Sequence, residues 1–202
     1  FKTVVNDVGG VEIELTESEA AYLNATNYIR PAKYRTVKAG KHTLNGAQAL
    51  GYCRIRKYAK GIQPVTPNGQ IDDYGRTWRQ RNAITSIFSK VKKMPKSQWL
   101  KIAKDVLKQN VKTDLSNKQI FNYIKDVVMM GTTTIHQLQI PVNPYFSGGN
   151  VPGVGSCLSI QKEYQADAIN QFVFKYDGKG GEFTYTPSSD VSGYVSSSTP
   201  SA

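Results

Sequence analysis

Alternation of apolar and polar residues predicts a strand near the start of the chain. The run 11–15, VEIEL, has apolar side chains at every second position, which is the period of a β-strand. The residues before it, FKTVVNDV, are typical of a short strand or the end of a helix. Gly9 and Gly10 predict a turn between this segment and the strand.

Two capping-box signatures follow the first strand. Thr16 has a glutamate three residues later, Glu19, and Asn45 has Gln48 at the same spacing. A side chain of each type can bond the backbone N–H of the other residue, so we expect a short helix to begin at each site. The second helix is expected to be brief and to lead into an extended segment, Cys53–Lys57.

Helical spacing of apolar residues dominates the middle of the chain. From Asp73 to about Met94 the apolar residues recur every three or four positions, which predicts a long helix. Further helices are predicted over about 96–109, after Ser116 with its partner Gln119, and over about 162–174.

The remaining segments predict strands and turns. The segment 132–141 is expected to be a strand, 143–156 a long turn, and the run 157–160, CLSI, another strand. Mixed strands and helices favour a layered α/β fold in a domain of residues 1–177. Residues 178–202 are rich in Gly, Ser, Thr and Pro, which is typical of a flexible tail or a linker.

Composition adds an anionic partner to this picture. The 202 residues carry a formal net charge of +11, which points to nucleic acid, a membrane surface or a phosphorylated ligand. No apolar stretch is long enough for a membrane-spanning helix. The chain starts at Phe1 without a methionine, so we expect it to be a processed or truncated piece. Two cysteines are too few for a disulfide scaffold, and no Cys/His spacing indicates zinc.

The basic charge is concentrated between Cys53 and Asn82. Arg54 and Arg56 are two residues apart, so in an extended segment they point to the same side. In the long helix, Arg76, Arg79 and Gln80 share one face of the first turns. If the two segments adjoin, their guanidinium groups form one patch, and such planar groups suit phosphate oxygens. A helix N-terminus adds free N–H groups for an anion.

The same helix becomes apolar after Gln80. Ile84, Ile87 and Phe88 continue its face, which fits a ligand with a charged head and an apolar tail; the alternative is an ordinary core stripe with charges at its end. Asp72 and Asp73 are either N-terminal caps, residues that hold the arginines in place, or a base.

Other classes of function have less support in the sequence. There is no zinc finger, no RNA-recognition signature and no helix-turn-helix with outward basic residues, which argues against nucleic acid as a partner. The nucleophile elbow, the phosphate loop and the HExxH zinc motif are also missing, which excludes these common hydrolase and nucleotide-binding signatures.

Three segments in order, VVNDVGGVEIEL, AGKHTLNGAQALGYCRIRK and DDYGRTWRQRNAITSIFSKV, resemble the LytR-CpsA-Psr family of bacterial cell-envelope proteins. The resemblance covers about residues 1–174, and its most specific part is R-x-R followed by D-x-x-R-x-x-R-Q. It implies an αβα sandwich with a central mixed β-sheet. It also implies an enzyme that moves a glycopolymer, such as teichoic acid or capsule, from an undecaprenyl-pyrophosphate carrier to peptidoglycan.

The family's site residues carry over to particular positions of this chain. The family's arginines grip the pyrophosphate, with help from Mg²⁺, and a long apolar pocket takes the polyprenyl chain. These arginines fall on Arg54 and Arg56, and the later Asp, Arg and Gln fall on Asp73, Arg76 and Gln80, with Arg79 in between. We therefore expect a pyrophosphate clamp formed by these arginines and Gln80. Asp73 and Arg76 are the catalytic candidates. Asp73 would either hold an arginine or accept the proton of the attacking hydroxyl. Ile84, Ile87 and Phe88 are expected to line the lipid pocket.

The chain also departs from the family pattern. The loop between Arg56 and Asp72 is longer than usual, and the N-terminal half, which carries the aspartates that hold the metal, is missing. The resemblance implies that this half of the domain is a partner of the chain, that the Mg²⁺ ligands lie in it, and that the protein is extracytoplasmic and anchored by an absent membrane helix. Two alternatives stay open: a polyprenyl-pyrophosphate binding module without turnover, and a DNA-binding transcriptional attenuator.

The two cysteines form the last expectation. Cys53 opens the expected extended segment and Cys157 opens the predicted strand 157–160. If these strands are neighbours, the sulfurs come within bonding range, and an extracytoplasmic location lets a disulfide persist. We therefore predict a Cys53–Cys157 disulfide; the alternative is two buried free thiols.

Overall fold

The computed structural model of the chain describes residues 1–95, 98, 102, 113–129, 135–179 and 183–191. Contacts divide the chain into two units, residues 1–133 and 134–202. The predicted helix over about 96–109 lies almost wholly outside the described residues, as do 180–182 and 192–202 of the predicted tail.

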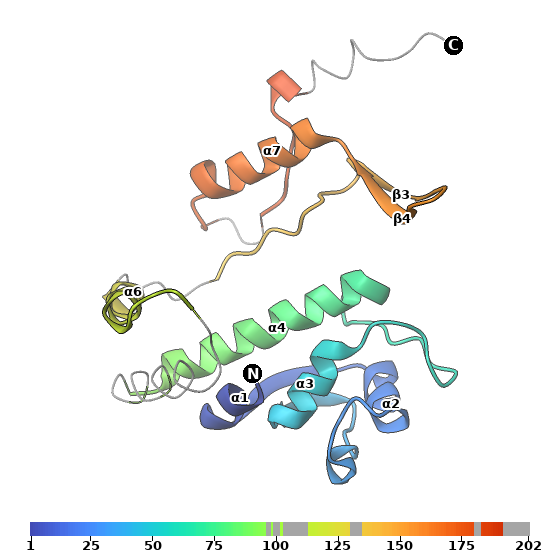
Figure 1. Ribbon diagram of the computed structural model, residues 1–202, viewed down its shortest axis with the longest axis vertical. Coiled ribbons are helices and arrows are strands. Elements are labelled where there is room, and N and C mark those ends of the chain that lie inside the picture. Colours follow the sequence, from blue (N-terminus) through green and yellow to red (C-terminus); the bar gives the residue numbers. More distant parts are fainter. Residues whose placement is uncertain (96–97, 99–101, 103–112, 130–134, 180–182, 192–202) are drawn as a thin grey trace. The chain divides into compact units, whose positions relative to one another are not determined.

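The first unit combines a two-stranded sheet with helices (Figure 1). Its elements in chain order are α1 (Lys2–Asp7), β1 (Val11–Leu15), α2 (Glu17–Ala25), the 3₁₀ helix η1 (Ala32–Tyr34), β2 (Gly40–Leu44), α3 (Gly46–Arg54), α4 (Asp72–Lys93) and α6 (Asn117–Met129). Strands β1 and β2 are antiparallel, with Val11 opposite Leu44 and Leu15 opposite Gly40. The helix-end alternative for the residues before β1 is confirmed, because α1 ends there in a turn with positive φ at Gly9 and Gly10.

The predicted helix starts are confirmed. Thr16 and Glu19 form a complete capping box at the start of α2, and Asn45 and Gln48 form another at the start of α3. At α6 the amide of Gln119 donates to Ser116 Oγ over 3.3 Å, and the amide of Ser116 donates to Gln119 Oε1 over 2.9 Å. Each box pairs two N–H groups that the helix itself leaves without partners.

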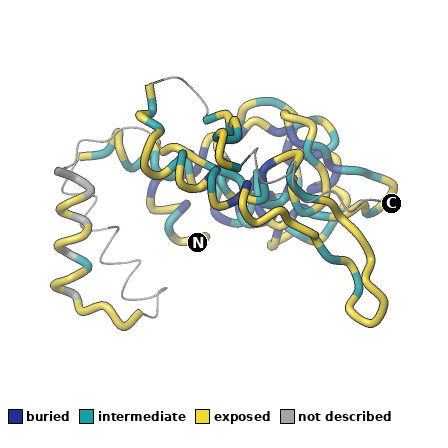
Figure 2. The backbone as a smooth tube through the Cα atoms, turned by 90° about the horizontal axis from the view of Figure 1, so that it is seen from above, coloured by how far each residue is buried: buried dark blue, intermediate teal, exposed yellow. Residues whose placement is uncertain are grey.

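The core of this unit lies between β1 and the helices. Val11, Ile13 and Leu15 are buried while Glu12 and Glu14 are exposed, as the alternating pattern predicts. Helix α3 contributes buried Tyr52, and α4 buries a line of residues four apart, Gly75, Arg79 and Ala83. Figure 2 colours the buried stretches of the backbone dark blue. One residue of this buried line, Arg79, is also a predicted site residue.

One local prediction in this unit is wrong. The segment Cys53–Lys57 is not extended throughout, because α3 continues to Arg54 and Ile55 is its C-cap. Tyr52 and Cys53 face the core as part of the helix, and an arginine in the last turn is favoured by the negative end of the helix dipole. Tertiary packing therefore carries the helix two residues into the segment that we expected to be a strand.

The second unit contains a hairpin and a helix. Its elements are β3 (Phe146–Val151), β4 (Gly155–Ile160), α7 (Lys162–Asn170) and the π-helical turn η2 (Gln171–Lys175). The predicted strand 157–160 and the helix over about 162–174 are confirmed. The predicted turn 143–156 is wrong, because β3 forms within it and pairs antiparallel with β4, reversing at Gly153, which has a φ of 78°.

The predicted strand 132–141 is also wrong over its described part. Residues 135–141 form neither helix nor strand, and Pro141 lacks the N–H that a sheet ladder needs. Residues 132–134 lie outside the described residues.

Aromatic rings hold the second unit together. Tyr145 and Tyr164 are stacked with ring centroids 3.9 Å apart, and Tyr185 packs edge-on against Tyr145. Asp167 Oδ2 accepts hydrogen bonds from the Tyr185 hydroxyl and the Ser188 amide. Residues 183–191 of the predicted tail are therefore attached to this unit, and a domain boundary at 177/178 stays a prediction.

The α/β class is confirmed, with a difference in the sheets. The described strands form two antiparallel pairs, β1–β2 and β3–β4. The part of the chain that the structure describes contains no parallel strand. None of the described helices is both long enough and apolar enough to cross a membrane.

Candidate functional site

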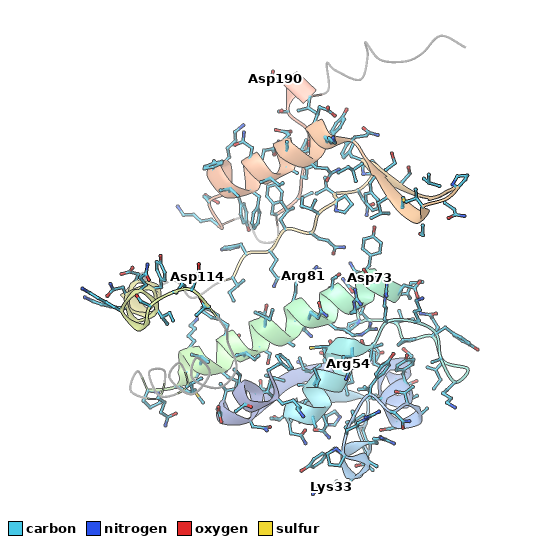
Figure 3. The ribbon with its side chains drawn as sticks, in the orientation of Figure 1. Lys33, Arg54, Asp73, Arg81, Asp114 and Asp190 are labelled. Carbon is cyan, nitrogen blue, oxygen red and sulfur yellow. The ribbon has the colours of Figure 1, made fainter. Side chains whose placement is uncertain are left out.

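The end of α3 and the start of α4 lie side by side, as the basic patch requires. Asn82 Nδ2 donates to the Tyr52 hydroxyl over 3.1 Å, and Gln80 Nε2 donates to the Cys53 carbonyl over 3.4 Å. Figure 3 labels Arg54 at the end of α3 and Asp73 at the start of α4. The two segments that carry the family's arginines therefore meet.

Asp73 joins two arginines from the two segments. Its Oδ1 lies 3.0 Å from Arg56 Nε and 2.6 Å from Arg76 Nη2. All three side chains are partly exposed, with 44%, 50% and 35% of Arg56, Asp73 and Arg76 accessible. One carboxylate oxygen thus holds both guanidinium groups at the same point. These ion pairs fit the role of holding arginines, and the role of Asp73 as a base stays a prediction.

The N-terminus of α4 adds to the positive potential at this point. Asp72 and Asp73 are in the first turn, where the helix dipole favours acids, but the N-cap residue is Ile71 and no side chain caps the helix. The expectation that one of these aspartates caps α4 by its side chain is therefore wrong.

Arg54 and Gln80 complete the exposed side of the patch. The Arg54 side chain is exposed and makes no ion pair with any described residue. Gln80 is also exposed, and its amide lies against the end of α3. The structure thus joins Arg56, Asp73 and Arg76 by ion pairs and places Gln80 against the end of α3, the helix that ends at Arg54.

The predicted patch has to be corrected at Arg79, which is fully buried. Its Nε donates to Glu19 Oε1 over 2.7 Å, and both side chains have 0% exposure. The helix turns 100° per residue, so Arg79 points about 100° away from the exposed Gln80 around the helix axis. In that direction its side chain faces the core. It cannot reach a ligand on the exposed side.

Glu19 is the residue that the sequence analysis missed. The capping box gave it a local role, and that role is real, since Glu19 Oε2 accepts from the Thr16 amide over 3.0 Å. Its other oxygen binds an arginine 60 residues further along the chain. Burial raises the pKa of the Glu19 carboxyl, because the charged form loses hydration, and the donors on Thr16 and Arg79 offset only part of this.

The loop from Arg56 to Asp72 is folded on itself. Ala59 and Ile62 form an isolated antiparallel bridge around Lys60 and Gly61, which both have positive φ. Thr66 accepts from the Gln70 amide over 2.8 Å and closes a second turn. The long loop therefore has defined turns on either side of Pro64.

The predicted lipid-contacting residues follow Gln80 along α4 but do not all point the same way. Ile84 is 57% exposed, whereas Ile87 packs against the core cluster, and Phe88 is half-buried. Because Gln80, Ile84 and Phe88 are four residues apart, they form one line on the helix. Their role as a lipid pocket stays a prediction.

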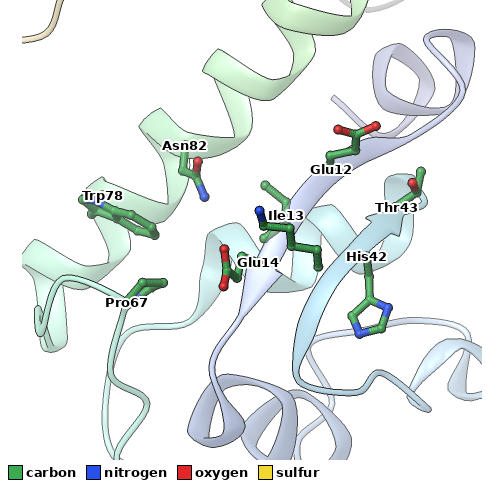
Figure 4. A pocket seen from close by; sticks show the side chains of 9 residues that line it. Glu12, Ile13, Glu14, His42, Thr43, Pro67, Trp78 and Asn82 are labelled. Carbon is green, nitrogen blue, oxygen red and sulfur yellow. The ribbon is translucent and has the colours of Figure 1, made fainter.

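A separate cleft lies on the other flank of α4 (Figure 4). Its volume is about 600 Å³, and Trp78 and Asn82 line it together with Glu12, Glu14 and other residues of the β1–β2 face. Trp78 is two residues from Arg76, about 200° around the helix. None of the predicted site residues lines this cleft.

The predicted disulfide is absent. Cys53 and Cys157 are both free, and they belong to different units. Cys53 lies in a helix and not in the expected strand, and burial raises its pKa to about 12, so the thiol stays protonated and unreactive at neutral pH.

The residues that the structure describes do not form a metal site. Within the described part of the chain no three His, Cys, Asp or Glu side chains come close enough to hold an ion. The expected Mg²⁺ therefore has no ligand set among these residues.

Comparison with known proteins identifies one protein family. The model of the LytR_cpsA_psr family matches residues 1–171. The regulatory protein MsrR of Staphylococcus aureus (strain COL) is 27% identical over 144 residues, which are 68% of this chain and 39% of MsrR. The polyisoprenyl-teichoic acid–peptidoglycan teichoic acid transferase TagU of Enterococcus faecalis is 35% identical over 118 residues, 57% of this chain and 31% of TagU.

A solved structure agrees on the fold. The crystal structure of B. subtilis TagT superposes with a TM-score of 0.55 at 19% identity, covering 85% of this chain and 55% of TagT. The chain thus spans less than half the length of the two curated relatives and about half of this structure.

Proposed function

The chain belongs to the LytR-CpsA-Psr family, and on this basis we propose that it carries the phosphate-binding part of a cell-wall glycopolymer transferase. The polymer, a teichoic acid, a capsule or a similar anionic chain, moves from an undecaprenyl-pyrophosphate carrier to peptidoglycan. TagU, whose name states such a transfer, supports the class of reaction.

One observation carries this proposal: Asp73 holds Arg56 and Arg76 together. Two guanidinium groups in one partly exposed place suit a pyrophosphate, because a guanidinium group can donate two parallel hydrogen bonds to phosphate oxygens. The start of α4 adds positive potential for the same anion.

The chemistry requires positioning and charge neutralisation. A hydroxyl oxygen of the peptidoglycan sugar bonds to the phosphorus next to the polymer, the bridging P–O bond breaks, and the lipid leaves as a monophosphate. Arg54, Arg56 and Arg76 bind the oxygens on which negative charge gathers, and Gln80 orients one of them. Since Asp73 is engaged by two guanidinium groups, we assign it to positioning, and the hydroxyl proton passes to a base outside this cluster.

Further parts of the proposal concern the lipid and the location. The exposed Ile84 and the half-buried Phe88, in line with Gln80, contact the first prenyl units of the carrier. The protein acts outside the cytoplasm, at the membrane that holds its carrier lipid. Mg²⁺, held by residues of another part of the domain, shields phosphate charge when bound, and that part is a partner of this chain.

A binding comparison tests the proposal. The full-length protein is titrated with farnesyl pyrophosphate, farnesyl monophosphate and a DNA duplex, each at several salt concentrations. We expect tight binding of the pyrophosphate, weaker binding of the monophosphate, and DNA binding that falls steeply with salt. Sequence-specific DNA binding without affinity for the pyrophosphate would favour the attenuator. Pyrophosphate binding without polymer transfer in a reconstituted assay would leave a lipid-binding module.

A further inference from the structure

Two fully buried charges lie beneath the arginine patch and do not touch its exposed side. Glu19 on α2 and Arg79 on α4 both have 0% exposure and are joined by a bond of 2.7 Å between Oε1 and Nε. Burying two charges is costly unless each is paired and its other donors are satisfied. The remaining bonds of this pair therefore show what it holds in place.

The other two nitrogens of Arg79 reach two points of the main chain. Nη1 donates to the Ile55 carbonyl over 3.4 Å, and Nη2 donates to the Pro64 carbonyl over 3.3 Å. These carbonyls flank the segment 56–63, which includes Arg56. A guanidinium group is planar and rigid, so one side chain fixes the distance between both ends of this loop.

The first turn of α2 holds the same loop end from the other side. Thr16 Oγ1 donates to the Val65 carbonyl over 2.8 Å, and the Val65 amide donates to Ser18 Oγ over 3.0 Å. Glu19 Oε2 accepts from the Thr16 amide. Glu19 thus links the turn that binds Val65 to the arginine that binds its neighbour Pro64.

The loop needs such a hold because its own charges repel. Segment 56–63 contains Arg56, Lys57 and Lys60 and no acid, and it lies beside Arg76. Asp73 is only partly buried and compensates for only part of this charge, since ion pairs near the surface contribute little. Without a buried anchor, like charges and chain entropy favour an open loop with Arg56 away from Asp73.

We propose that Glu19 and Arg79 are positioning residues that close the loop 56–63, so that Arg56 and Arg76 meet a pyrophosphate as one site. The inference rests on the proposed function, but it assigns the pair no contact with the ligand. It also gives Arg79 a role within the D-x-x-R-x-x-R-Q segment that differs from the role of Arg76.

Three variants of the full-length protein separate positioning from stability. Arg79→Lys keeps the charge opposite Glu19 but has one nitrogen, which cannot reach the carbonyls of Ile55 and Pro64 together. The double variant Glu19→Leu with Arg79→Met removes both buried charges, an exchange that proteins often tolerate. Glu12→Gln is the matched control, because it breaks an exposed ion pair between β1 and Lys90 of α4 far from the loop.

Two measurements are made on each folded variant, as judged by circular dichroism. Hydrogen exchange reports the amides of 57–63, and titration gives Kd for farnesyl pyrophosphate. We expect Arg79→Lys and the double variant to raise exchange in the loop at least about tenfold and Kd about tenfold. Glu12→Gln should change neither.

The outcomes distinguish this inference from the proposed function. Unchanged loop exchange in both Arg79 variants, or faster exchange with an unchanged Kd, overturns the positioning role. If the wild-type protein does not bind the pyrophosphate at all, the proposed function fails and the ligand-positioning role falls with it. The exchange data then still decide whether the pair closes the loop.

Discussion

Replacement of Arg76 by alanine tests the site most directly, because Arg76 is partly exposed and its role in the fold is small. Its ion pair with Asp73 is a surface contact, so its loss should lower the free energy of unfolding by about 0.2–1 kcal/mol. Asp73 keeps Arg56 as a partner at 3.0 Å. The variant should therefore fold, and any large loss of ligand binding comes from the missing phosphate contacts.

The expected loss of affinity follows from those contacts. A hydrogen bond to a charged group contributes about 1.5–3 kcal/mol, and about 1.4 kcal/mol corresponds to a tenfold change. Kd for farnesyl pyrophosphate should thus rise about 10- to 150-fold in Arg76→Ala, as measured by calorimetric titration at constant salt. Arg76→Lys should recover only a small part, because the planar fork is lost.

Lys90→Ala is the matched control for charge. It removes one cation from the same helix, 14 residues and about 21 Å along its axis, together with an ion pair to Glu12. We expect its Kd to stay within about twofold of the wild-type value. Equal losses in Arg76→Ala and Lys90→Ala would mean that net charge alone attracts the ligand, and the site as described would be refuted.

Three other predictions concern the scaffold. In Gly75→Ala the new Cβ would lie 2.9 Å from Arg79 Nη1 and 3.0 Å from the Gln70 carbonyl oxygen. The cost of overpacking, about 1–3 kcal/mol, should outweigh the gain in helix propensity of about 1 kcal/mol. Urea unfolding measures the net change in stability, and a variant more stable than the wild type would contradict this close packing. Thiol titration of unreduced, denatured protein should find two free thiols per chain, with Cys53 unreactive before unfolding; fewer than two would restore the disulfide. Burial raises the pKa of Asp167, but the hydrogen bonds from Ser188, Tyr185 and Gln171 outweigh it and lower the pKa below the ordinary value of an aspartate. The ionised carboxylate therefore stabilises the folded state above that ordinary pKa, and this contribution is lost as the pH falls through the folded-state pKa. Acid unfolding of the second unit should be less steep in Asp167→Asn, and an unchanged profile would show that these bonds do not act on stability.

Local signals in the sequence located much of the first unit correctly. The capping boxes at Thr16, Asn45 and Ser116 and the helical spacing after Asp73 depend on residues within one or two turns, and all appear in the structure. The alternation in 11–15 likewise identified the buried face of β1. Such features need no knowledge of the rest of the chain.

Predictions that depended on distant partners were less reliable. The segment after Cys53 was expected to be extended, but burial of Tyr52 and Cys53 against the core continues α3 to Arg54. The strand β3 was missed because SGGN within it has weak strand propensity, and pairing with β4 forms it nonetheless. The disulfide required two strands to be neighbours, and Cys53 is not in a strand.

The sequence by itself determined which residues could bind a phosphate: the arginines, their spacing of two and three, and the helix predicted from Asp73. Only the tertiary structure decided which of them can reach a ligand. Arg76 and Arg79 look equivalent in the sequence pattern, and they lie only about 60° apart around the helix axis, but the direction of Arg79 faces the core. Burial becomes possible for Arg79 because Glu19, 60 residues earlier, supplies the opposite charge, and no local pattern encodes a pairing over that distance.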